Sequence, residues 1–210
     1  MYTTFTTLIL GLSICLAALP TLATTTADLQ QEWAIANYQT ETASKADSFE
    51  ALITRAEAAL AAEPKNADLL IWTAIIKSTY AGVSGGLSAL SLVKAARGHL
   101  EDAMEIDDKA LQGSVYTSLG ALYYQVPGWP IGFGSDKKAR EMLDKAVSLN
   151  PGGLDTNYFY GDFLVQQKQY AGARTRLNRA MAAVARPGRE VADAGRRVEI
   201  SALLEKIKDK

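Results

Sequence analysis

The sequence contains very few of the residues from which catalytic and metal sites are usually built. Its 210 residues include one cysteine, Cys15, and one histidine, His99. A single cysteine cannot form a disulfide within the chain, and a lone histidine forms neither a metal cluster nor a thiol dyad. We therefore interpret His99, which stands beside Glu101 and Asp102, as a partly exposed helical residue. We expect no metal ion, no cofactor and no enzymatic activity.

An excess of either charge is also missing. The chain has 22 Lys and Arg against 23 Asp and Glu, with an isoelectric point of about 5.9. This balance gives no reason to expect a nucleic acid or an anionic membrane as partner. The charges are nevertheless unevenly placed, because residues 1–136 carry 7 basic and 14 acidic residues while residues 137–210 carry 15 and 9. The plainer interpretation is two differently solvated surfaces, and the alternative is head-to-tail self-association or steering of a partner.

Long apolar runs are rare, and the longest lies at the N-terminus. Residues 8–19 form a twelve-residue apolar run that Pro20 ends, and small residues follow up to Ala23. A membrane span needs ~20 apolar residues, whereas a secretory signal peptide has a run of this length before a small-residue cleavage site. We therefore predict that residues 1–23 are a signal peptide. Its removal would leave a cysteine-free chain without a transmembrane span, periplasmic or secreted.

The sequence does contain the pattern of a helical hairpin, and this pattern occurs twice. In both copies the marked residues of the first helix are spaced by 3, 1 and 3, and those of the second helix by 4, 3 and 5. At 3.6 residues per turn, each set lies on one face of its helix, with small residues where two helices must approach closely. The first copy has Tyr116, Leu119, Gly120, Tyr123, Ala139, Leu143, Ala146 and Pro151; the second has Asn157, Tyr160, Gly161, Leu164, Ala173, Leu177, Ala180 and Ala185.

The second-helix pattern also recurs earlier in the chain, from Leu52 and from Ala96. The four copies start 44, 43 and 34 residues apart, and 34 residues is the length of a tetratricopeptide (TPR) unit. The chain therefore resembles the TPR family, which implies an all-α, right-handed solenoid of helical hairpins. We expect residues 24–210 to form one domain, with a final helix that covers the terminal apolar face. The expected hairpins are about 28–64, 66–108, 112–151 and 154–187, and the capping helix is 190–208.

The two longer periods indicate insertions within two successive hairpins, near Gly82–Leu87 and at Val126–Ser135. Both follow the first helix of their hairpin, so we expect them to meet at one rim of the groove. The second insertion carries Trp129 and Phe133, and long loops in compact folds are usually functional. We hypothesise that these aromatics face Tyr124 across a binding cleft. The alternative is that they only brace the loop on its own hairpin.

Several further residues are candidates for binding because they lie one position round the helix from the packing face. These candidates, expected to point into the inner groove, are Thr117, Tyr124, Asp155, Tyr158 and Asp162. The arginines of the C-terminal quarter are instead interpreted as a solvated surface. They are Arg174, Arg176, Arg179, Arg186, Arg189, Arg196 and Arg197.

The TPR resemblance implies a non-enzymatic scaffold that binds a protein or peptide partner in its concave groove. One subtype grips a C-terminal carboxylate with Lys, Asn and Arg on the inner face, but here the inner positions include Ile71 and Ile75. A narrower resemblance is to the periplasmic T-component of TRAP transporters, carried by the stretch from Pro127 to Ala139. It implies contact with a solute-binding protein and passage of a small apolar ligand. The chain departs from that family because it has no lipobox, since Ile14 precedes its only cysteine.

Overall fold

The computed structural model describes residues 23–210, and these fold into nine α-helices. No β-strand occurs in this part of the chain, and none of its helices combines the length and apolarity that crossing a membrane requires. Cys15 and the predicted signal peptide, up to residue 22, lie outside the described residues. The helices are α1 (Thr26–Tyr38), α2 (Thr42–Ala62), α3 (Ala67–Ser84), α4 (Gly86–Ile106), α5 (Ala110–Gln125), α6 (Asp136–Leu149), α7 (Leu154–Gln166), α8 (Tyr170–Met181) and α9 (Glu190–Lys206).

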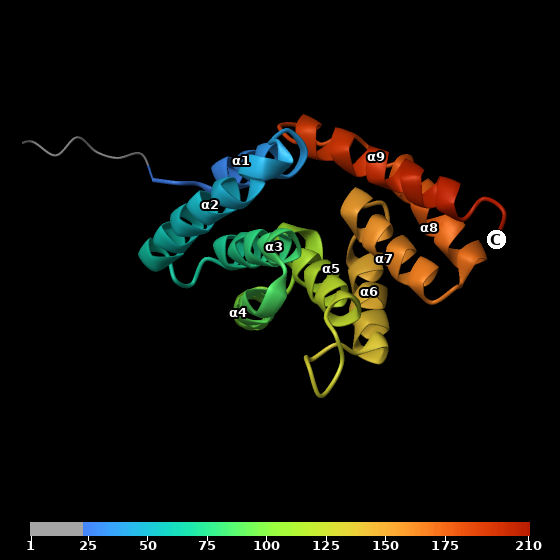
Figure 1. The fold of residues 1–210 in the computed structure, drawn as a ribbon, viewed down its shortest axis with the longest axis horizontal. Coiled ribbons are helices and arrows are strands. Elements are labelled where there is room, and N and C mark those ends of the chain that lie inside the picture. Colours follow the sequence, from blue (N-terminus) through green and yellow to red (C-terminus); the bar gives the residue numbers. More distant parts are fainter. Residues whose placement is uncertain (1–22) are drawn as a thin grey trace, which may run out of the picture.

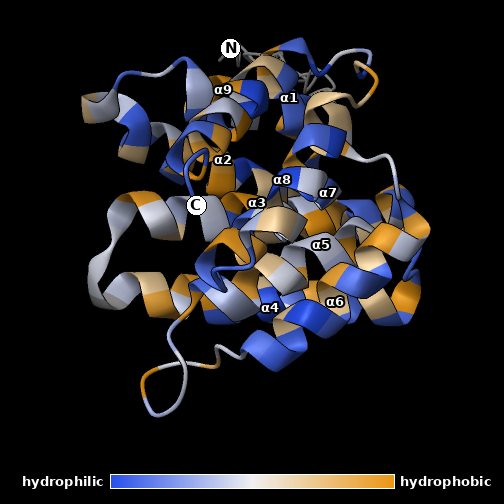
Figure 2. Cartoon of the chain, turned by 90° about the vertical axis from the view of Figure 1, so that its right-hand side faces the viewer, coloured by the Kyte–Doolittle hydropathy of each residue, from blue (hydrophilic) through white to orange (hydrophobic). Residues whose placement is uncertain are grey.

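The helices pair in chain order into four antiparallel hairpins, α1–α2, α3–α4, α5–α6 and α7–α8, followed by α9. Figure 1 shows the hairpins side by side in a curved stack. Apolar residues gather where neighbouring helices meet, and polar residues cover the outward faces (Figure 2). The predicted fold class, an all-α TPR-like solenoid of four hairpins with a capping helix, is confirmed.

Side chains at the first turns explain where several helices begin. The Thr25 hydroxyl accepts a hydrogen bond from the Asp28 N–H, and the Asp28 carboxylate accepts one from the Thr25 N–H, which makes a capping box for α1. Asn66 and Ser135 cap α3 and α6 in the same position. Such caps satisfy N–H groups that have no partner inside the helix, and each stabilises its helix by about 1 kcal/mol.

Small residues at the marked positions let paired helices approach closely. A Cβ atom on Gly120 would lie 2.7 Å from Cγ of Leu143, and one on Gly161 would lie 2.7 Å from Cγ of Leu177. Both leucines are completely buried. The two hairpins therefore repeat one contact, in which a glycine on the first helix receives a leucine from the second. The repeated alanines of the second helices, Ala139, Ala146, Ala173 and Ala180, are buried as well.

The last helix packs not only on α8 but also against α1, so the stack closes into a ring (Figure 1). The contact is tight at Gly195, where an added Cβ would lie 2.4 Å from the ring of Tyr38 at the end of α1. The sequence pattern predicts that α9 covers the end of the stack, but it contains no sign that α9 returns to the first helix. This closure surrounds the concave face with helices.

The two predicted insertions differ in kind. The extra residues of the first insertion lengthen its two helices, because α3 continues to Ser84 and α4 begins at Gly86. Only Gly85 separates the two helices, and its φ of 62° is easily reached by glycine. The second insertion, 126–135, is a loop as predicted. It is held by hydrogen bonds from Gly134 N–H to the Pro127 carbonyl (3.0 Å) and from Ser135 N–H to the Tyr123 carbonyl (2.7 Å).

Candidate functional site: the cavity inside the ring

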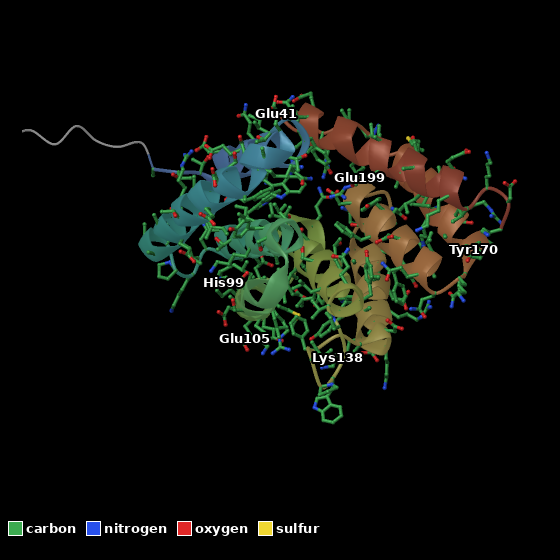
Figure 3. All side chains as sticks on the ribbon, in the orientation of Figure 1. Glu41, His99, Glu105, Lys138, Tyr170 and Glu199 are labelled. Atoms are coloured by element: carbon green, nitrogen blue, oxygen red, sulfur yellow. The ribbon has the colours of Figure 1, made fainter. Side chains whose placement is uncertain are left out.

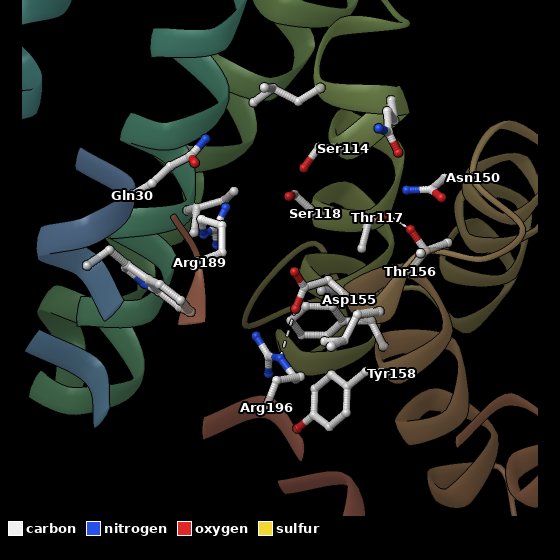
Figure 4. Close-up of a pocket in the computed structure, with 18 of the residues that line it drawn as sticks. Gln30, Ser114, Thr117, Ser118, Asn150, Asp155, Thr156, Tyr158, Arg189 and Arg196 are labelled. Atoms are coloured by element: carbon white, nitrogen blue, oxygen red, sulfur yellow. Dashed lines mark hydrogen bonds and ion pairs between the residues drawn. The ribbon is translucent and has the colours of Figure 1, made fainter. Parts of the chain in front are cut away.

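The closed ring encloses a cavity of about 660 Å³. The first helices of all four hairpins, α1, α3, α5 and α7, contribute to its wall, and the remaining side is formed by α9 and the segment before it. Figure 4 shows that side chains from these separate elements converge on one space. The wall contains apolar, aromatic, hydroxyl, amide and charged groups, so it is suited to a ligand that has both polar and apolar parts.

One side of the cavity is built around Asp155, near the start of α7. Its Oδ2 lies 2.7 Å from Nη1 of Arg186. Its Oδ1 lies 2.9 Å from Nε of Arg196, the pair marked in Figure 4. Burial by itself would raise the pKa of Asp155, but Arg196 and Arg186 outweigh it and lower the pKa to about 2. Arg186 also bonds to Asp193 on α9 (Nη2–Oδ1 2.6 Å). The cluster thus ties α7 to α9 and to the turn before it.

Arg196 is the most buried of these arginines, with 7% of its surface exposed. Its guanidinium lies 4.2 Å from the ring centre of Tyr158 and 4.8 Å from that of Phe159, and it also bonds to Glu199 (2.5 Å). Glu199 lies between α9 and α7, on the far side of the molecule from Lys138 (Figure 3). Burial raises the pKa of Tyr158 to about 12, so its phenol stays protonated near neutral pH. The neighbours of Arg196 therefore fix it in place.

A third arginine, Arg189, projects into the cavity from the residue before α9. Its guanidinium lies 4.9 Å from the ring centre of Trp72 on α3, within range of a cation–π contact. It forms no ion pair with any described residue, and its Nε is buried without a hydrogen-bond partner. Figure 4 shows Arg189 beside Gln30 of α1, with Ser114 and Ser118 of α5 facing them across the cavity.

The beginning of α5 has an unusual backbone where it borders the cavity. Leu111 (φ 49°) and Gln112 (φ 58°) adopt left-handed conformations, followed by Gly113 (φ 75°). Such a conformation is costly for residues other than glycine, and strained residues of this kind gather at functional sites. Leu111 and Gln112 both line the cavity. The regular helical backbone is thus interrupted in this segment, where it borders the cavity.

Comparison with known proteins agrees with the geometry of the second half of the chain. Residues 137–196 match the family model described as Tetratricopeptide repeat. The fold is a TPR-like helical solenoid. The match runs from α6 into α9, so it includes Asp155, Arg186 and Arg189. None of the curated proteins matches the chain.

The TPR-like solenoid brings three of the predicted binding residues to its cavity. Thr117, Asp155 and Tyr158 line it, and the Thr117 hydroxyl lies 3.3 Å from that of Thr156. Tyr124 does not line it, because its ring is buried between α5 and α7. There its hydroxyl donates to Asp162 (2.8 Å), another predicted groove residue. These two residues bind each other between the helices.

The predicted cleft between the loop aromatics and Tyr124 is wrong. Among the described residues that line the cavity there is none from 126–135, and this loop lies on the side of the molecule away from α1 and α9 (Figure 1). Trp129 is 90% exposed. Phe133 packs edge-on against Tyr123 (5.9 Å) and beneath Arg97 of α4 (4.5 Å). The loop is thus braced by Phe133 on its own hairpin and on α4, while a binding role for Trp129 stays a prediction.

Sequence reasoning missed the charged part of the site. Arg186, Arg189 and Arg196 were interpreted as solvated surface, but they line the cavity because α9 folds back across the ring. Trp33 and Trp72 also line the cavity, and neither was among the predicted binding residues. A signal was present in the acidic residues Asp155 and Asp193, which can pair with these arginines. It is only interpretable once the closure of the ring is known.

Proposed function

We propose that the protein is an exported, non-enzymatic scaffold that holds a segment of a protein or peptide partner in the cavity inside its ring. The cavity carries this proposal, because all four hairpins and α9 contribute to its wall. The TPR match supports a role in protein interaction. Support for export comes from the sequence of residues 1–23.

The size of the cavity restricts the form of the partner. Its 660 Å³ lies within the ~300–1,000 Å³ of typical ligand sites. A folded domain cannot enter such a space, so a protein partner would insert a loop or a terminal segment. Free hydroxyl and amide groups suit this role, since the side chains of Gln30, Ser114 and Ser118 make no hydrogen bond to other described residues.

The charged groups of the cavity wall count against the T-component-like alternative. It requires a cavity or pore suited to a small apolar ligand, whereas this wall carries three arginines, two carboxylates and several hydroxyl groups. Placing an apolar ligand against them would remove water from these polar groups without replacing its hydrogen bonds. The cavity therefore does not favour that function.

The proposal can be tested by blocking the cavity with a matched pair of variants. Ser118 lines the cavity, whereas Ser148 is exposed on α6 and does not line it. The immobilised full-length chain, Ser118→Trp and Ser148→Trp would each be used to capture proteins from an extract of the source organism, followed by mass spectrometry. We expect the parent and Ser148→Trp to capture the same partner and Ser118→Trp to lose it. Equal capture by a folded Ser118→Trp would refute binding in the cavity.

A further inference from the structure

We infer that Arg189 makes the cavity a binding site for a carboxylate group. The inference rests on the proposed function, since it names the chemical group that the bound segment or ligand presents. The site is not on the inner face of a repeat: Arg189 comes from the turn between the last hairpin and α9, and it reaches the cavity because the ring closes. Two sources share this chemistry, a polypeptide with an acidic side chain or free terminus and a small organic acid.

The first argument is the pairing of the three arginines. Arg186 is bonded to Asp155 and Asp193, and Arg196 to Asp155 and Glu199. These bonds use the available carboxylates of the cluster. Arg189 is left with only its stacking contact on Trp72, and no described acidic residue pairs with it.

The charge of the wall leads to the same result. Three arginines and two carboxylates, Asp155 and Glu199, line the cavity, and a third carboxylate, Asp193, pairs with Arg186, so Arg189 is the arginine of this cluster that has no carboxylate partner. Both lining carboxylates are neutralised by arginine contacts of 2.9 Å or less, so their repulsion of a bound anion is weakened. A guanidinium also matches the two oxygens of a carboxylate geometrically.

The environment of Arg189 favours an anionic partner. The side chain is half-buried, and its Nε is shielded from solvent without a hydrogen-bond partner. Burial and the neighbouring Arg186 lower the pKa of Arg189, although Asp155 and Asp193 oppose this. A buried charge is unfavourable unless it is paired. A carboxylate at this position would satisfy the guanidinium, while Trp72 holds it in place beforehand.

The opposite wall can hold the rest of such a ligand. Ser114 and Ser118 face Arg189 and Gln30 across the cavity (Figure 4). Their hydroxyl groups and the Gln30 amide can donate or accept hydrogen bonds. A ligand anchored by its carboxylate at Arg189 therefore meets polar groups on the far side and the Trp33 and Trp72 rings beside it.

The test compares probes that differ only in charge. Binding to the full-length chain would be measured by calorimetry for benzoate and benzamide, and for N-acetyl-trialanine with a free or an amidated C-terminus. We expect at least one acid to bind more tightly than its amide. Arg189→Gln should weaken binding of that acid by about tenfold or more, as the loss of a hydrogen bond to a charged group predicts. Arg179→Gln, an exposed arginine on α8, should leave the affinity unchanged.

The outcome also identifies the source of the carboxylate. Preference for the free-acid peptide indicates a polypeptide, and preference for benzoate indicates a small organic acid. If the acids bind no better than the amides, if Arg189→Gln binds them as tightly as the parent, or if no probe binds up to its solubility limit, the inference is overturned. If Arg189→Gln fails to fold, two other measurements decide the question. One is binding of the probes to Arg189→Lys, which keeps the charge. The other is the stabilisation of the parent against heat by each acid, compared with its amide.

This inference and the proposed function fail separately. Capture that depends on an open cavity, combined with no preference for carboxylate probes, would retain the scaffold and remove the carboxylate site. Binding of benzoate that depends on Arg189, combined with capture that Ser118→Trp does not affect, would retain the site and remove the scaffold function from the cavity.

Discussion

Replacing Gly161 with alanine should destabilise the protein, whereas replacing Gly98 with alanine should stabilise it. In a helix interior, alanine is favoured over glycine by about 0.5–1 kcal/mol because glycine loses more backbone freedom on folding. Gly98 lies in α4, and an added Cβ there meets no atom within 4 Å. Gly98→Ala should therefore raise the free energy of unfolding by about 0.5–1 kcal/mol.

Gly161→Ala carries the same gain but introduces a clash. Its Cβ would lie 2.7 Å from both Cγ and Cδ2 of Leu177, and Leu177 is completely buried, so it cannot move into solvent. Overpacking a core of this kind costs about 1–3 kcal/mol. Since the helix-propensity gain is common to both variants, the difference between them isolates the overpacking cost. We expect Gly161→Ala to be less stable than Gly98→Ala by about 1–3 kcal/mol.

Urea denaturation followed by far-ultraviolet circular dichroism measures both variants against the parent, provided that the m-value stays constant. The double variant Gly161→Ala/Leu177→Ala adds a control, because the new methyl group then occupies space that the leucine vacates. The cost of the two changes together should be smaller than the sum of their separate costs. Gly161→Ala as stable as Gly98→Ala would refute the proposed packing of glycine against leucine.

Three further predictions follow from the contacts of the ring and the loop. Asp155→Asn should lower the free energy of unfolding by about 1–3 kcal/mol, because it leaves two arginines poorly paired. Since the folded pKa of Asp155 is about 2 and an unfolded aspartate has a pKa of about 3.9, its contribution should be present above about pH 4 and be lost as the pH falls through 2 in acid titrations. Trp129→Ala should change the melting temperature little because the ring is exposed, whereas Phe133→Ala should lower it; the reverse order would contradict the bracing role of Phe133. Gly195→Ala should push Tyr38 away and increase amide hydrogen exchange in α1, and unchanged exchange there would contradict closure at this contact.

The hairpins could be predicted from the sequence because their determinants are local. Residues such as Gly120 and Leu143 recur at fixed spacings, and each helix pair buries its own marked face. Ring closure could not be predicted in this way. It depends on the summed rotation of four hairpins and on a contact between Tyr38 and Gly195, which are far apart in the sequence and carry no shared pattern.

The same reason limits what could be predicted about the site. Thr117, Asp155 and Tyr158 were placed correctly by helical periodicity, which reports on the facing side of a single helix. Periodicity did not reveal that α5 and α7 pack closely enough to bury Tyr124. It also said nothing about Arg189, which lies in the turn after the last hairpin and reaches the cavity from the residue before α9.

The central claim is that binding takes place inside the ring rather than at the exposed loop, and hydrogen–deuterium exchange of the full-length chain with its captured partner tests this most directly. We expect protection to increase at the cavity wall, including the first turns of α5 and α7 and the segment around Arg189, and to stay unchanged at residues 127–132. Protection confined to residues 127–132, with the cavity wall unaffected, would contradict the account and assign binding to Trp129.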